Sequence, residues 1–239
     1  STGLISTRGC PYVCAFCSTD VHGTLRLRSP SNVIGEIDEI ITTFDFRALH
    51  FYDDTFTIRP YDQLKEICSA MKRRGILYRC TGDLRRDDEK TLRLLYETGC
   101  RDYCVGVESG SQKVLDAVRK GTTVKRNIEV IKTAKRIGLP VRAFFMVGCP
   151  GETEKTVRET IRFMDEARPD RYSVFSFVPY PDCDIYKHPG KYGVKIKSKD
   201  YHEYCMVAAQ GEGRFVIETE ELNTEQIAML YREVRRAAE

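Results

Sequence analysis

The sequence lacks several features that would each point to a particular class of protein. No apolar run approaches the roughly 20 residues that a membrane-spanning helix needs, and the first residues do not resemble a signal peptide. Neither sign of charge dominates, because 38 Lys and Arg face 35 Asp and Glu and leave a net charge of +3. We therefore expect no membrane span and no nucleic-acid-binding or membrane-binding surface.

Ten cysteines occur in the 239 residues, yet their distribution argues against a disulfide framework. Such frameworks are typical of small secreted chains, whereas this chain has no secretory signal and its predicted elements are long. Cys10, Cys14 and Cys17 lie within eight residues, and the other seven are scattered, as suits small buried hydrophobic residues. We predict a metal site at the three clustered cysteines and a reducing, cytoplasmic setting.

An apolar stretch followed by a helical pattern repeats along the chain, which predicts alternating strands and helices. The predicted strands are Leu4–Ser6, Ala48–Tyr52, Leu77–Thr81, Tyr103–Val107, Val141–Val147 and Tyr172–Val178. The predicted helices are Asn32–Phe44, Tyr61–Arg74, Glu89–Thr98, Gln112–Val118, Val124–Ile137, Glu154–Ala167 and Thr224–Ala238. Alternation of this kind implies parallel pairing, because a parallel crossover needs a dozen or more residues. The predicted fold is α/β, a partial (β/α)6 parallel barrel, with an open doubly wound sheet as the competing arrangement.

The pattern weakens after Pro179, and residues 180–222 read as irregular before the last helix. We predict a barrel at residues 1–179 and a C-terminal helical extension at 180–239, which packs on the barrel and is not an independent domain. In parallel barrels and doubly wound sheets, functional residues follow the carboxyl ends of the strands. The unusual residues of this chain do follow predicted strands.

The cysteine loop has the spacing C-x3-C-x2-C directly after the first predicted strand. Fe–S clusters normally use four cysteines, so three would leave one iron with an open coordination position for chemistry. Spacing alone also fits structural zinc, with His22 as the fourth ligand beside Cys10, Cys14 and Cys17. A zinc-stabilised binding module and an Fe–S electron carrier are therefore alternatives that spacing leaves open.

Residues 7–18 as a whole resemble the signature of the radical S-adenosylmethionine (SAM) superfamily, including the aromatic Phe16 just before Cys17. The resemblance implies a partial barrel of the radical SAM type and an oxygen-sensitive [4Fe–4S] cluster bound by Cys10, Cys14 and Cys17. It implies that SAM binds the fourth iron and that the backbone of Phe16 helps to fix the adenine. The implied reaction is reductive cleavage of SAM to a 5′-deoxyadenosyl radical, which abstracts hydrogen from a small-molecule substrate. The implied electron donor is a protein such as flavodoxin or ferredoxin.

Further motifs after the predicted strands also resemble this family, which implies that they contact SAM. These implied cofactor-binding residues are Tyr52, Asp53, Asp54, Glu108, Ser109, Arg119 and Gly148. From the residues alone, Asp54 also fits a helix-capping turn, although two adjacent carboxylates fit it less well; Ser109 fits a helix cap, and Arg119 fits a solvated charge. Arg79, Thr81, Asp83 and Arg142 also lie on or after predicted strands, and we place them in the same pocket.

Three segments look most like the cobalamin-dependent radical SAM branch, which includes methyltransferases and the anaerobic Mg-protoporphyrin cyclase type. They are residues 26–30, 53–56 and 108–111. This likeness implies cobalamin as a further cofactor and methylation or ring formation as the reaction. Such proteins usually carry a cobalamin-binding domain ahead of the cysteine loop, whereas Cys10 lies nine residues from Ser1. We expect a trimmed core of a longer protein, with a member that works without cobalamin as the alternative.

Overall fold

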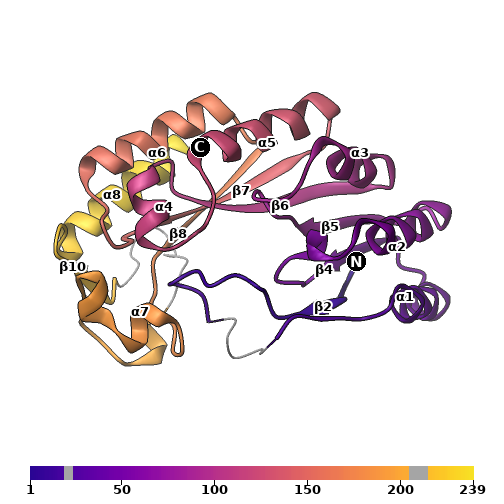
Figure 1. Cartoon of the computed structure of the whole chain (residues 1–239), viewed down its shortest axis with the longest axis horizontal. Helices are drawn as coiled ribbons and strands as arrows, with labels where there is room; N and C mark the ends of the chain where they lie inside the picture. Colours follow the sequence, from indigo (N-terminus) through magenta and orange to yellow (C-terminus); the bar gives the residue numbers. More distant parts are fainter. Residues whose placement is uncertain (19–23, 205–214) are drawn as a thin grey trace.

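The computed structural model describes residues 1–18, 24–204 and 215–239. Its centre is a six-stranded sheet in which every pairing is parallel (Figure 1). In spatial order the strands are β1 (Thr2–Leu4), β4 (Ala48–Phe51), β5 (Leu77–Thr81), β6 (Cys100–Glu108), β7 (Val141–Val147) and β8 (Arg171–Ser176). Each strand lies beside the next strand of the sheet in the chain, which is the order of a barrel and not of a doubly wound sheet. The predicted partial (β/α)6 barrel is confirmed.

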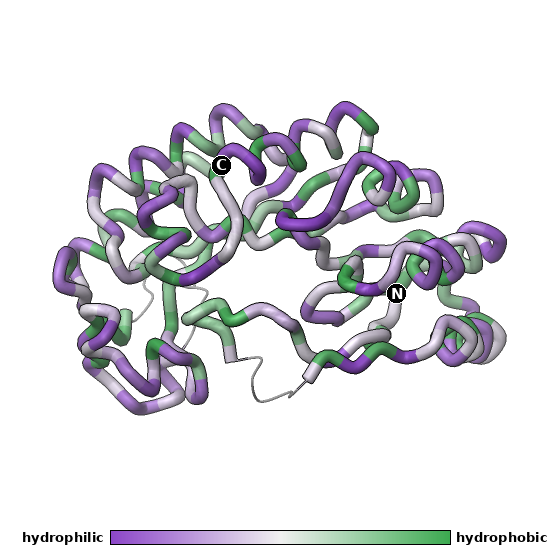
Figure 2. Tube along the Cα trace, in the orientation of Figure 1, coloured by the Kyte–Doolittle hydropathy of each residue, from purple (hydrophilic) through white to green (hydrophobic). Residues whose placement is uncertain are grey.

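Helices connect the strands and pack side by side in a layer over the sheet (Figure 1). They are α1 (Pro30–Phe44), α2 (Tyr61–Arg73), α3 (Glu89–Glu97), α4 (Gln112–Ala117), α5 (Val124–Ile137), α6 (Glu154–Ala167) and α8 (Thr224–Ala237). Hydrophilic residues recur along their outer sides (Figure 2). Side-chain caps fix several boundaries: Ser29 accepts from the backbone of Asn32 at α1, and Asn223 forms a capping box at α8, as its position predicts.

Alternation along the strands sends apolar side chains toward the helices and polar ones to the opposite face. Leu49 and Phe51 of β4 are buried in the core. On the opposite face, Asp102 of β6 forms ion pairs with Arg79 of β5 at 3.5 Å and Arg142 of β7 at 3.1 Å. Thr81 and Asp83 line the cavity that contains Cys10, Cys14 and Cys17, whereas Arg79 and Arg142 are not in its wall, and their contact with a cofactor stays a prediction.

The first predicted strand is displaced in the structure. β1 ends at Leu4, and a separate strand β2 (Thr7–Arg8) pairs antiparallel with β3 (Arg26–Leu27). The reason is Asp53, whose carboxylate accepts the backbone N–H groups of Ser6 at 2.6 Å and Thr7 at 2.9 Å. These two donors are thereby taken by a side chain, and the chain leaves the sheet edge before the cysteine loop begins.

The segment after β8 is more regular than predicted. It contains α7 (Asp184–Lys187), η3 (Pro189–Tyr192), β9 (Val194–Ile196), η4 (Tyr201–Glu203) and β10 (Ile217–Thr219). The last of these strands pairs antiparallel with β9. Strands of three residues are too short to show a hydrophobic period, so the sequence does not predict this ribbon. α8 packs against α6, β7 and β8, and the division at residue 179 stays a prediction. Within the described ranges, no helix has the length and apolar character to cross a bilayer.

Candidate active site

The three loop cysteines line one cavity of about 200 Å³ at the carboxyl end of the sheet. All three are half-buried cysteines outside any disulfide. The loop is held from both sides, because Ala15 donates its N–H to the Val118 carbonyl at 2.8 Å and accepts from Ile185 at 3.1 Å. The rest of the cavity wall includes Phe16, Asp54, Thr55, Thr81, Asp83, Arg85, Gly106, Glu108 and Lys120. Loops after β4, β5 and β6 thus face the cysteines, as the strand-end rule predicts.

Arg85 connects the cysteine loop to the turn after β5. Its Nη2 donates to Cys14 Sγ at 3.2 Å, and its guanidinium lies 3.6 Å from the centre of the Tyr12 ring. Burial raises the pKa of the Cys14 thiol, and the charges of Lys120 and Arg85 oppose this rise by favouring the thiolate. Tyr12 in turn donates to Asp83 at 2.5 Å, and burial together with this carboxylate raises the pKa of Tyr12 to about 12.

Glu108 and Lys120 form an ion pair at 2.7 Å on the opposite wall, with side chains that are only 12% and 14% exposed. Glu108 ends β6 at a register shift and has a φ of 65°, a left-handed conformation that is uncommon for a side chain of this size. Gly106 makes the arrangement possible, because a Cβ there would lie 2.3 Å from Glu108 Oε1. The register shift in β6, the left-handed backbone of Glu108 and the lack of a side chain at Gly106 together direct the Glu108 carboxylate into the cavity.

The two neighbouring aspartates after β4 have different surroundings. Asp53 is 4% exposed and accepts hydrogen bonds from the backbone N–H groups of Ser6 and Thr7. The guanidinium of Arg59 donates to the side-chain hydroxyl of Ser6 at 2.7 Å. Asp54 lines the cysteine cavity and accepts from the backbone of Gly9 at 3.1 Å. The structure therefore assigns Asp53 to holding the start of the cysteine loop and leaves Asp54 facing the cavity.

The other predicted cofactor residues lie outside this cavity wall. Ser109 is buried and accepts from the N–H of Ser111 at 3.1 Å, which matches its reading as a turn residue before α4. Arg119 pairs with Asp184 of α7 at 2.6 Å. Gly148, with a φ of 94°, donates to the buried Glu152, and Tyr52 is an exposed ring beside another groove. Their contacts with SAM stay predictions.

Sequence reasoning missed Arg85 and Lys120. A signal was present, because Arg85 follows the β5 strand end by four residues and Lys120 adjoins Arg119, which was singled out. His22, the fourth ligand of the zinc alternative, lies outside the described residues. Within the described residues, no three His, Cys, Asp or Glu side chains are grouped so that they could hold a metal ion.

The donor set fits an iron–sulfur cluster with one iron left for another ligand. Thiolates are the usual ligands of such clusters, and the loop supplies three of them to one cavity. Arg85 and Lys120 add positive charge beside these thiolates, which favours their ionised, metal-binding form. Asp54 and Glu108 supply further acceptors on the same cavity wall, suited to the ammonium or hydroxyl groups of a small polar ligand.

Comparison with known proteins identifies the class. The model of the radical SAM superfamily matches residues 4–164, and the chain therefore belongs to this superfamily. The match covers the cysteine loop and every strand of the sheet except β8 and the first residues of β1.

Three curated relatives show which members the chain resembles. It is 32% identical to an uncharacterized methyltransferase of Pyrococcus horikoshii, over 77% of this chain and 41% of that protein. It is 31% identical to the anaerobic magnesium-protoporphyrin IX monomethyl ester cyclase of Rubrivivax gelatinosus, over 84% of this chain and 36% of the cyclase. The cytidylyl-2-hydroxyethylphosphonate methyltransferase of Streptomyces wedmorensis is 30% identical over 76% of this chain and 36% of its own length. The chain thus spans about two-fifths of these relatives.

Solved structures share the fold at lower identity. The cobalamin-dependent SAM radical enzyme OxsB, solved with aqua-cobalamin and SAM, superposes with a TM-score of 0.75 at 17% identity, over 98% of this chain and 40% of OxsB. The radical SAM methyltransferase TsrM from Kitasatospora setae, solved with cobalamin and a [4Fe–4S] cluster, gives 0.68 at 18% identity, over 83% of this chain and 39% of TsrM. Both likenesses confirm the partial barrel of the radical SAM type.

Proposed function

We propose that this chain is the radical SAM core of an enzyme that methylates or cyclises a small-molecule substrate. Cys10, Cys14 and Cys17 would hold the [4Fe–4S] cluster, and the cavity that they line would hold SAM. The observation that supports this most directly is that one cavity contains the three thiols together with Asp54 and Glu108. Methylation, ring formation and the use of cobalamin are supported by the named relatives, whose own length the chain covers only in part.

When bound, the reduced cluster supplies the electron that cleaves the sulfonium of SAM to methionine and a 5′-deoxyadenosyl radical. The residues of the chain contribute placement and electrostatics. Arg85 donates to Cys14 and rests on Tyr12, which fixes the loop against the turn after β5. Glu108 and Asp54 present carboxylate oxygens to the ammonium or ribose hydroxyls of the nucleotide. Lys120, bonded to Glu108, prevents two unpaired carboxylates from facing the same space.

The proposed setting follows the same reasoning. We propose a reducing, cytoplasmic environment, an oxygen-sensitive cluster and an electron donor such as flavodoxin or ferredoxin. None of the nine described cysteines belongs to a disulfide, which supports the reducing environment.

The decisive test replaces one cluster ligand. Protein reconstituted anaerobically with iron and sulfide is treated with SAM and dithionite, with and without methylcobalamin, and 5′-deoxyadenosine and S-adenosylhomocysteine are measured by mass spectrometry. Cys14→Ala should lose the brown colour and all SAM cleavage. Cys68→Ala, which removes a fully buried thiol of α2, should keep both. An iron-replete, active Cys14→Ala protein, or wild-type protein that holds zinc without sulfide, would refute the proposal.

A further inference from the structure

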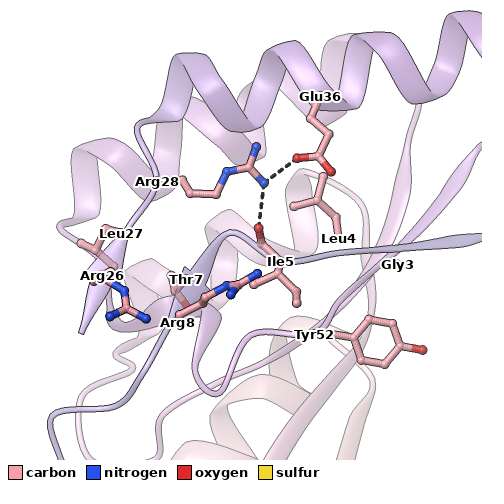
Figure 3. Close-up of a pocket in the computed structure, with 10 residues that line it drawn as sticks. All are labelled: Gly3, Leu4, Ile5, Thr7, Arg8, Arg26, Leu27, Arg28, Glu36 and Tyr52. Carbon is pink, nitrogen blue, oxygen red and sulfur yellow. Dashed lines mark hydrogen bonds and ion pairs between the residues drawn. The ribbon is translucent and has the colours of Figure 1, made fainter. Parts of the chain in front are cut away.

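A groove of about 760 Å³ lies at the free edge of the sheet, outside the cysteine cavity. It is bounded by β1, the β2–β3 ribbon and the start of α1 (Figure 3). Ile5 and Tyr52 are exposed large hydrophobic residues in its wall, 39% and 63% accessible. The proposed function assigns nothing to this groove.

Two arginines face each other across the ribbon without an acidic partner among the described residues. Arg8 and Arg26 are direct cross-strand neighbours, so their side chains stand on one face of the ribbon (Figure 3). Like charges in this position are destabilising. Neither guanidinium forms an ion pair with any described residue. The third arginine, Arg28, forms an ion pair with Glu36 at 2.5 Å and donates to the Ile5 carbonyl at 2.8 Å. Glu36 is the only carboxylate among the described residues that line the groove, and Arg28 already pairs with it.

The groove and the cysteine cavity are neighbours, with a smaller cavity between them. A smaller cavity of about 260 Å³ shares Ile5, Thr7, Arg8 and Tyr52 with the groove and adds Asp54. Asp54 also lines the cysteine cavity. A molecule held at the two arginines would therefore lie close to Asp54, whose carboxylate accepts from the N–H of Gly9, the residue after Arg8.

We propose that Arg8 and Arg26 anchor a carboxylate or phosphate group of the substrate, whose body extends toward Asp54. This inference rests on the proposed function and specifies its substrate class as an anionic small molecule. Guanidinium groups suit the site, because their planar N–H pairs match carboxylate and phosphate oxygens. Bound negative charge would also offset the repulsion between the two arginines, which no ion pair within the described part of the chain does.

Calorimetric titration of the reconstituted chain tests the inference without any turnover. The probes are phenyl phosphate and benzoate, with phenol as their neutral counterpart. We expect one site for each anion, affinity that falls as NaCl is added, and at least tenfold weaker binding of phenol. Arg8→Gln and Arg26→Gln should each weaken anion binding at least tenfold. Arg162→Gln, which removes an exposed arginine of α6 that forms no ion pair with a described residue, should change anion binding less than twofold.

Three outcomes would overturn the inference: no anion binding to the wild-type chain, equal affinity in the Arg26→Gln protein, or an equal loss in all three variants. Circular dichroism and cluster absorbance show whether each variant is folded. Cleavage of SAM by the wild-type protein is measured separately. A chain that cleaves SAM but binds neither anion would refute this inference alone, and one that binds the anions but holds no cluster would refute only the proposed function.

Discussion

At the carboxyl end of the sheet, the cations Lys120 and Arg85 have acidic neighbours, whereas on the ribbon beside β1 Arg8 and Arg26 face each other with no ion-pair partner among the described residues. Lys120 is matched by Glu108, and Arg85 donates to Cys14 and lies 3.5 Å from Asp83. Arg8 and Arg26 share a ribbon face, and neither has an ion-pair partner in the part of the chain that the structure describes. Both regions lie beside the cysteine loop, so a difference in distance from the proposed reaction centre does not explain the contrast.

The difference follows from burial. The Glu108 and Lys120 side chains are nearly enclosed, and an unpaired charge there would be costly because water cannot solvate it. The groove is open to solvent, so unpaired guanidinium groups are tolerated at a modest cost. An enclosed site must balance its own charge, whereas an open one can leave charge for a ligand. Three substitutions sharpen this contrast.

The largest effect is expected at Glu152, a fully buried acid in the turn after β7. Burial raises the pKa of Glu152 from 4.5 to about 8, against backbone hydrogen bonds from Gly148 and Cys149 that lower it. The folded protein therefore keeps a proton that the unfolded chain releases above its own pKa. The free energy of unfolding must then fall as pH rises from about 4.5 to about 8, by at most about 1.4 kcal/mol per pH unit from this one group.

Glu152→Gln should remove this contribution, because an amide does not ionise. Urea unfolding of both proteins at several pH values between 5 and 8 measures the difference, which we expect to total about 2–4 kcal/mol across the window. Glu154→Gln provides the matched control, because Glu154 is an exposed acid in the first turn of α6. Parallel pH profiles for wild type and Glu152→Gln would show that Glu152 is ionised in the folded protein.

A smaller effect is expected when the enclosed ion pair is broken. Lys120→Met keeps most of the side-chain volume but leaves Glu108 without its cation, which should lower the free energy of unfolding by about 1–3 kcal/mol. Lys113→Met is the control, because Lys113 is 60% exposed and lies 3.8 Å from Glu221, so its loss should cost less than about 1 kcal/mol. Equal losses in the two variants, measured by urea unfolding, would mean that enclosure does not strengthen the Glu108 pair.

The sequence predicted the barrel because strands β5 and β7 and helices α5 and α6 carry complete hydrophobic periods, and their bounds match the structure residue for residue. It failed at β1, where the Asp53 side chain takes over backbone donors and leaves no periodic signal. The cysteine cavity was predictable in outline, since motif and strand-end rule agree on the loop, Asp54 and Glu108. Arg85 acts through contacts with residues 35 or more positions away in the chain, and Lys120 directly follows the left-handed residue Arg119. No local sequence pattern shows either feature.

The smallest effect is expected at the ribbon and has the opposite sign. Arg26→Gln removes one of two like charges that stand directly opposite each other, so it should raise the free energy of unfolding by about 0.5 kcal/mol at low ionic strength. The gain should vanish in high salt, because salt screens exposed charges, and urea unfolding at low and high NaCl measures both values. Arg162→Gln should show neither the gain nor its salt dependence. Destabilisation by Arg26→Gln at low salt would mean that an acid balances the ribbon arginines after all. The open groove would then not differ from the enclosed cavity in the pairing of its charges.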